Sequence, residues 1–291
     1  MSIRARFIIL IGILSLLATI GIGATSYKFS VDNALAEAKS KGHLVFDYLQ
    51  SSRIYFKSQQ RPLIMEHVAR GTFIPELMSG FTLTRGVWSE FQKKNKDYLF
   101  KQATIDPLHP DNKADKFDLV IIDKFRKNQN MKQAEGVIDK NGASYFYYAE
   151  PIKVSRNCLR CHGDPANAPQ AVTEKYGTEN GYHWKAGTVA AAYVIYVPIQ
   201  DALNKAKKAA VNLVAIGAGG VLVLMLIIWI FFSQYVVKPI STLEKRATEI
   251  SLGKNLAQPI NITSKDEIGS LARAVDRLRI SVDRMLKRFQ K

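Results

Sequence analysis

The sequence predicts an α+β domain carried between two membrane-spanning helices and followed by a short all-α segment. Two uncharged runs, at residues 7–27 and 209–237, exceed the about 20 apolar residues that a helix needs to cross a bilayer. Between these runs, helical patterns come first and β-rich runs come last. That order is typical of an antiparallel sheet with helices on one face.

The first apolar run is expected to be an uncleaved span. Its apolar region is long, and Gly23-Ala24-Thr25 is a poor match to the small-residue cleavage site of a signal peptide. The predicted domains follow from the two runs: a cytoplasmic N-terminus at 1–6, spans at 7–27 and 209–232, an external α+β domain at 28–208 and a helical pair at 233–291.

Basic residues near the two runs set the expected orientation. Arg4 and Arg6 precede the first run, and Lys238 and Lys245 follow the second. Since basic residues favour the cytoplasmic side, both ends are expected inside and residues 28–208 outside.

Three helices are expected before and within the sheet, because apolar residues recur there at intervals of three and four: 30–60, 75–96 and 114–127. The first can continue the membrane span outward as a stalk, and Arg61-Pro62 is expected to end it.

Four β-rich runs predict the strands of the sheet: 98–106, 135–139, 144–152 and 188–199. Asn141-Gly142 separates the second and third runs, and this dipeptide is the strongest short signal for a hairpin. Residues 163–187 are rich in Gly, Pro and Asn and are expected to form a loop.

The formal net charge of +16 is spread along the chain. No part is basic and clustered enough to indicate a nucleic-acid partner. Basic residues after the second span suit the anionic lipids of an inner leaflet.

The stretch Cys158-Leu159-Arg160-Cys161-His162 has the Cys-x-x-Cys-His spacing of c-type haem attachment. Two thiols one short turn apart can each add to one haem vinyl group, and the following histidine can offer a ring nitrogen to the iron. One covalent haem c is therefore expected, with thioethers to Cys158 and Cys161 and His162 as the proximal ligand.

Three other interpretations of the two cysteines stay open. Half of a zinc site would need further ligands, and the chain has no second cysteine pair. A thioredoxin-like redox pair needs no adjacent histidine, and a structural disulfide is the third alternative. Bacterial c-type haem is attached outside the cytoplasmic membrane, which agrees with the predicted topology and indicates a periplasmic haem domain on the bacterial inner membrane.

Residues 50–199 resemble the Tll0287-like, or DUF3365, haem-domain family. The resemblance rests on a series of short motifs in order: Arg61-Pro62, Phe73-Ile74-Pro75, Asp106-Pro107, Pro110-Asp111-Asn112, Pro151-Ile152, Cys158 to Gly163, Ala168-Pro169, Tyr176-Gly177, Gly181-Tyr182-His183-Trp184-Lys185 and Val197-Pro198. It implies a PAS-like fold with a covalent c-type haem, joined to membrane signalling modules. This chain departs from the family pattern at two positions. His109 stands where the family often has Asn, and Glu150 stands where it often has Arg. An Arg there could contact a haem propionate, so that contact is in doubt for Glu150.

The distal side of the iron is less defined. Some relatives use a cysteine before the haem motif, but this chain has no third cysteine. Met78, near the corresponding place, is the expected distal ligand; otherwise the sixth position is open and could bind a gas. The remaining histidines are weaker candidates: His43, His67, His109 and His183.

The segment after the second span resembles a HAMP domain. It has an early proline in Val237-Lys238-Pro239-Ile240 and the motif Asp266-Glu267-Ile268-Gly269. Two such helices can bury their apolar faces in the four-helix bundle of a parallel homodimer. The alternative is a pair of amphipathic helices lying on the membrane.

These features favour a sensor that detects redox state or a small gas such as NO, CO or O₂, and passes the signal inward through HAMP. A membrane-anchored electron-transfer cytochrome is the main alternative. A haem enzyme is disfavoured, because no acid/base constellation is evident. The sequence given ends soon after HAMP, so the output is expected on a separate cytoplasmic partner, unless the coding region is cut short.

Overall fold

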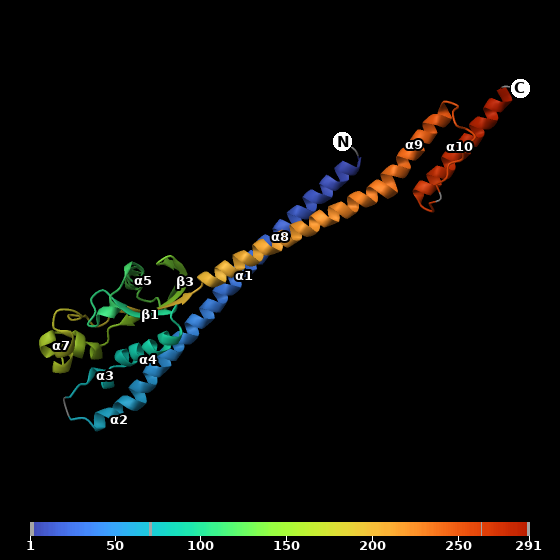
Figure 1. Ribbon diagram of the computed structural model, residues 1–291. Helices are drawn as coiled ribbons and strands as arrows, with labels where there is room; N and C mark the ends of the chain where they lie inside the picture. Colours follow the sequence, from blue (N-terminus) through green and yellow to red (C-terminus); the bar gives the residue numbers. More distant parts are fainter. Residues whose placement is uncertain (1–2, 70–71, 263, 290–291) are drawn as a thin grey trace. The chain divides into compact units, whose positions relative to one another are not determined.

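The computed structural model describes residues 3–69, 72–262 and 264–289. The chain forms two compact units, shown with their element labels in Figure 1. The sheet unit comprises Lys28–Lys207, and the helical unit comprises Met1–Tyr27 with Lys208–Lys291. Each unit is described by itself.

A four-stranded antiparallel sheet forms the centre of the sheet unit, in the order β1-β4-β3-β2. The strands are β1 (Leu99–Thr104), β2 (Ala134–Lys140), β3 (Ala143–Lys153) and β4 (Val189–Pro198). All four predicted strands are present. The hairpin between β2 and β3 turns at Asn141 and Gly142, with φ of 53° and 80°, as a two-residue turn with two positive φ angles requires.

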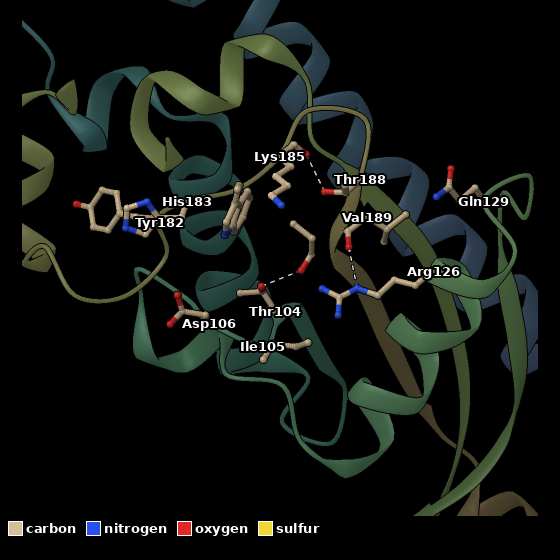
Figure 2. A pocket seen from close by; sticks show the side chains of 12 residues that line it. Thr104, Ile105, Asp106, Arg126, Gln129, Tyr182, His183, Lys185, Thr188 and Val189 are labelled. Atoms are coloured by element: carbon tan, nitrogen blue, oxygen red, sulfur yellow. Dashed lines mark hydrogen bonds between the residues drawn. The ribbon is translucent and has the colours of Figure 1, made fainter. Parts of the chain in front are cut away.

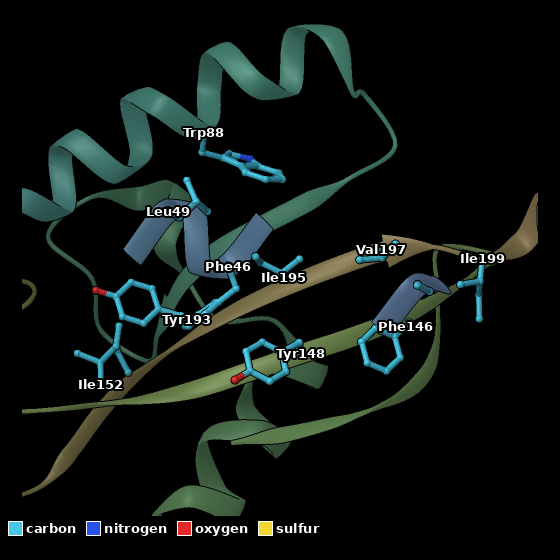
Figure 3. Packing of buried hydrophobic residues seen from close by; sticks show 12 residues of the cluster. Phe46, Leu49, Trp88, Phe146, Tyr148, Ile152, Tyr193, Ile195, Val197 and Ile199 are labelled. Carbon is cyan, nitrogen blue, oxygen red and sulfur yellow. The ribbon is translucent and has the colours of Figure 1, made fainter. Parts of the chain in front are cut away.

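One face of the sheet packs against two helices, α1 (Ile3–Tyr55) and α4 (Gly80–Lys94). Figure 3 shows this cluster, in which Phe46 from α1 and Trp88 from α4 lie over Tyr193 and Ile195 of β4. Phe46 and Tyr193 meet edge to face with ring centroids 6.0 Å apart.

The opposite face packs against α5 (Lys116–Lys127) through Ile122 and Phe125, which meet Val194 and Tyr196 of β4. The expectation of helices on one face is therefore wrong. Since both sets of alternating side chains in β4 are apolar, neither face of the central strand can be left to water.

A buried carboxylate ties α5 to the sheet. Asp118 is fully buried, accepts a hydrogen bond from the Tyr196 hydroxyl and lies 3.2 Å from the Lys101 ammonium group. Its second oxygen accepts the backbone N–H of Asp115, whose own side chain caps the first turn of α5. This capping box fixes the start of the helix.

The stalk helix is longer than the sequence predicts. The α1 helix runs without a break from the first apolar run, as expected of a stalk, but Pro62 does not end it. A π-helical turn (Phe56–Gln60) leads into α2 (Arg61–Glu66), and the Arg61 N–H bonds to the Phe56 carbonyl five residues back. Proline is tolerated here because it lies in the first turn of α2, where its missing N–H leaves little unpaired.

The predicted helix at 75–96 is two helices, α3 (Pro75–Met78) and α4. Ser79 between them is extended, and its hydroxyl accepts the Thr82 N–H as the cap of α4. The expected loop at 163–187 contains a further short helix, α7 (Gln170–Tyr176).

The helical unit consists of long helices. The second apolar run lies in α8 (Gln200–Phe231), and both it and α1 are long and apolar enough to cross a membrane. Glycines allow α1 and α8 of one chain to approach closely. A Cβ added to Gly23 would lie 2.4 Å from the Val214 side chain, and one added to Gly217 would lie 2.6 Å from the Thr19 side chain.

The chain ends in two helices, α9 (Lys238–Ser251) and α10 (Glu267–Phe289). Leu243, Ile250 and Ala272 are buried in this pair. Three further apolar residues on α10, spaced seven apart, remain about half exposed: Leu271, Leu278 and Met285.

Candidate haem site

The Cys-x-x-Cys-His motif follows directly on β3. Cys158 ends a 3₁₀ turn, η3 (Arg156–Cys158), and Cys161 and His162 lie in the single turn of α6 (Leu159–His162). Both cysteines are free and partly buried. Burial raises the pKa of the Cys161 thiol, whereas nearby Arg160 acts in the opposite direction.

The ring of His162 is fixed on two sides. Its Nδ1 lies 2.7 Å from the Gly181 carbonyl oxygen, and the Trp184 ring stacks on it with centroids 3.9 Å apart and planes 8° apart. A carbonyl can only accept, so Nδ1 carries the proton and Nε2 keeps its lone pair. Burial also lowers the pKa of His162, which favours the neutral form that a metal requires.

The chain segment that supplies Gly181 and Trp184 is joined to the motif by backbone hydrogen bonds. The His183 N–H donates to Gly163, and the Trp184 N–H donates to the carbonyl of His162 itself. These contacts position the stacking ring without using a side chain of the motif. The Cys-x-x-Cys-His motif contains neither residue. Both lie in the Gly181 to Lys185 motif of the family resemblance, but their contact with His162 is made only in the fold.

Cys158, Cys161 and His162 line one cavity of about 300 Å³, here called the haem-site cavity. Its walls are largely apolar and include Phe56, Phe73, Leu108 and Val172. No Asp or Glu is among the described residues that line it, but five cations are: Arg53, Lys57, Arg61, Arg85 and Arg160.

Met78 lines the same cavity, so the structure brings it together with the haem motif. Its side chain is 3% exposed. Among the described residues, its sulfur accepts one long contact of 3.5 Å, from the Ile74 N–H at the start of α3. The break at Ser79 thus places a buried thioether at the cavity.

The other histidines are distributed differently. His109 also lines the haem-site cavity, where burial lowers its pKa. His43 lies elsewhere, 3.3 Å from Glu135 and against the Tyr148 ring, and His67 follows the end of α2.

Glu150, one of the two departures from the family pattern, does not line the haem-site cavity. Its carboxylate accepts a 2.8 Å hydrogen bond from the Tyr148 hydroxyl instead.

Comparison with known families agrees with this geometry. The family model described as Tll0287-like matches residues 31–198, which is more than half of the chain. The chain belongs to the Tll0287-like family. A second model, the HAMP domain, matches residues 231–284, so α9 and α10 form a HAMP domain.

One solved structure is similar to the Tll0287-like domain. It is described as the crystal structure of the cyanobacterial heme-protein Tll0287 and is 18% identical, with a TM-score of 0.44. The match covers 56% of this chain and 95% of that one. No curated protein matches the chain.

A Tll0287-like domain indicates haem binding, and the residues of the haem-site cavity fit a haem. Two thiols at the attachment spacing, a neutral imidazole with a free Nε2 and a largely apolar wall are the donor set and surroundings that a c-type haem needs. Arg61 also has a buried Nε without a hydrogen-bond partner among the described residues.

The Tll0287-like domain has a second cavity of about 520 Å³, whose lining residues are drawn in Figure 2. Trp184 lines both cavities, so the ring that stacks on His162 is a wall between them. Figure 2 shows the Lys185 and Arg126 side chains reaching into this second cavity, where the Arg126 Nε donates to the Val189 carbonyl. His183, with φ of 58°, lies at its side.

Proposed function

We propose that this protein is a membrane-bound sensor that carries one covalent haem c and relays the state of that haem through its HAMP domain. The observation that carries this proposal is the convergence of Cys158, Cys161 and the oriented His162 on one cavity of a domain that leads into a HAMP segment. HAMP domains indicate signal transduction, and Tll0287-like domains indicate haem binding.

In this proposal each motif residue has one role. Cys158 and Cys161 form the two thioethers, and His162 binds the iron through Nε2. Met78 is the distal ligand, or else the sixth position is open to a small molecule such as NO, CO or O₂. The bound haem supplies an iron whose oxidation state or ligation can change.

Chain continuity supports a route for the signal from the sheet to HAMP. The central strand β4 ends at Pro198, and α8 begins at Gln200. A displacement of β4 therefore acts directly on the start of the second apolar helix. That helix continues through a π-helical turn into α9 of HAMP, from which the signal reaches a partner in the cytoplasm.

The sheet unit lies in the periplasm and HAMP lies in the cytoplasm, with α1 and α8 crossing the bacterial inner membrane. The basic residues at both cytoplasmic ends support this orientation. A homodimer is proposed because Leu271, Leu278 and Met285 leave an apolar stripe exposed at heptad spacing in a single chain.

The two domains indicate a non-catalytic signalling or cytochrome role. Between these, the HAMP domain favours signalling, because an electron carrier needs no signal converter attached to its membrane helix. No catalytic residue is proposed.

The test of the site uses the full-length protein expressed with a c-type haem maturation system. The denatured wild-type chain is expected to keep a haem stain on a gel, and the Cys158→Ser/Cys161→Ser double variant is expected to lose it. Absorption spectra of the oxidised and reduced protein, recorded with and without CO and NO, then show whether the sixth coordination position of the iron is occupied by a side chain or open. A stain that survives in the double variant would rule out covalent attachment at this motif.

A further inference from the structure

Three basic residues line up along the helix that continues outward from the first apolar run. Arg53 in α1, Lys57 in the π-helical turn and Arg61 in α2 follow one another at intervals of four residues. Residues at this spacing share one side of a helix. All three line the haem-site cavity, so one helix presents a row of positive charge to it.

Arg53 is partly buried and has no carboxylate partner among the described residues. Its guanidinium carbon lies 3.9 Å from the Phe81 ring centroid and 5.4 Å from that of Tyr193. Gly80 leaves the space for this arrangement, since an added Cβ would lie 3.1 Å from the Arg53 Cγ. Burial lowers the pKa of Arg53, and no ion pair with a described acidic residue offsets that desolvation.

Arg61 also has a polar atom that lacks a partner. Its Nε is buried and has no hydrogen-bond partner among the described residues. A buried donor without a partner is costly, and native structures contain few of them. Because no described acidic residue lines the haem-site cavity, the two arginines lack an anion that the described part of the chain could supply.

We propose that Arg53 and Arg61 bind the two propionate carboxylates of the haem. This inference rests on the proposed function, because it requires a haem in this cavity. The other parts of a haem already have partners there: Cys158 and Cys161 for the vinyl groups and His162 for the iron. A haem also brings two carboxylates, and the planar fork of arginine suits bidentate pairing with a carboxylate.

The consequence is a second connection between haem and membrane. The thioethers join the haem to α6, whereas the propionate contacts join it to the helix that contains the first apolar run. A change at the haem then acts on α1 through Arg53 and on α8 through β4. The signal would reach both membrane helices of one chain.

The test compares Arg53→Gln, Arg61→Gln and the double variant with Arg126→Gln. Arg126 is a matched control, because it lines only the second cavity. Haem content per chain is measured first, and the thioethers are expected to keep it at the wild-type level in all variants. Resonance Raman bands of the propionates and the reduction potential from pH 5 to 8 are then measured on full-length protein.

In the wild type, the arginines hold the propionates ionised, so the potential is expected to be nearly constant over this range. In the Arg53→Gln and Arg61→Gln variants the propionates lose this charge inside a largely apolar cavity, so their pKa is expected to rise above the value of about 4.3 of an ordinary carboxyl group and into the measured range. The potential is then expected to fall as pH rises through that pKa, and the propionate bands shift. Arg53→Lys and Arg61→Lys keep the charge and are expected to restore the flat profile without restoring the bands.

Two results would overturn this inference while leaving the haem site intact. One is a full haem complement with propionate bands and a pH profile like those of Arg126→Gln. The other is a loss of thermal stability in Arg53→Gln without either spectroscopic change, which would mean that Arg53 only packs on Phe81. Absence of haem from the wild type would instead contradict the proposed function.

Discussion

At the scale of single residues, the sequence identifies the groups that would bond to the haem but not the ones that orient them. The Cys158 to His162 motif can be recognised from five consecutive residues. The Gly181 carbonyl and the Trp184 ring, which fix the tautomer and plane of His162, lie about 20 residues away and reach it only through the fold. A free Nε2 is therefore a property of the structure and not of the motif.

The buried thioether of Met78 gives the first prediction. Replacing Met78 with Leu keeps the volume and costs less than about 1.5 kcal/mol, so the fold persists while the sulfur is lost. If Met78 binds the iron, the weak absorption band at the red end of the oxidised spectrum is expected to disappear.

Met65→Leu is the control for this experiment, because Met65 is 49% exposed and does not line the haem-site cavity. An unchanged spectrum in Met78→Leu would remove Met78 as a ligand and leave the sixth position open or occupied by another group.

The second prediction concerns Tyr196, whose hydroxyl donates to the fully buried Asp118. Tyr196→Phe removes that donor and is expected to destabilise the sheet unit by about 1–3 kcal/mol. Tyr48→Phe, at a 63% exposed position, is the matched control and is expected to change little. Denaturant unfolding followed by near-ultraviolet circular dichroism measures both.

The same hydroxyl predicts a loss of stability at alkaline pH. Burial and the charge of Asp118 raise the pKa of Tyr196 above its ordinary value of 10. The phenol therefore ionises more readily in the unfolded chain than in the folded one. Its contribution to the free energy of unfolding is fully present below pH 10 and falls as the pH rises above 10. In Tyr196→Phe this fall is expected to be shallower; an equally steep fall would assign it to other groups.

At the scale of elements, the two-residue hairpin turn gives a prediction with an internal control. Gly142 has φ of 80°, where a Cβ costs about 1–2 kcal/mol, so Gly142→Ala is expected to destabilise the sheet unit. Gly86 lies within α4 with open space around it, and Gly86→Ala is expected to stabilise the protein by about 0.5–1 kcal/mol. Thermal unfolding would refute the argument if the two changes shifted the midpoint in the same direction.

Local patterns predicted the elements better than their ends. Alternating and β-branched residues correctly predicted all four strands, and Asn141-Gly142 correctly predicted the hairpin. The continuation past Pro62 and the break at Ser79 were missed, because a π-helical turn and an N-cap decide them rather than the spacing of apolar residues. The helix α5 on the second face could have been expected from the apolar character of both sides of β4.

The sequence alone does not single out the basic residues Arg53, Lys57 and Arg61 of the stalk helix, because most rows of basic residues four apart lie in water. Only the structure shows that Arg53 packs on Phe81. It also shows that Arg61, which lines the same cavity as the haem motif, has a buried Nε with no hydrogen-bond partner among the described residues.

At the scale of the whole molecule, the proposed function requires that haem state alter the packing of HAMP. Leu278 is the middle residue of the exposed heptad stripe on α10 and is 54% exposed in a single chain. In a parallel dimer this stripe faces its counterpart, and two HAMP packings of similar energy can turn a small displacement into a population shift.

Leu278→Cys tests this directly, because in the proposed function both native cysteines are consumed by the haem thioethers, which leaves the new thiol as the only free one. Cross-linking is expected across the dimer, with a yield that differs between oxidised and reduced haem or between ligand-free and ligand-bound haem. Arg273→Cys, about 140° around α10 from Leu278, is the control and is expected to cross-link weakly in every state. A Leu278→Cys yield that stays constant across all haem states, together with rapid electron exchange with soluble cytochromes, would contradict the sensor and favour a membrane-anchored electron carrier.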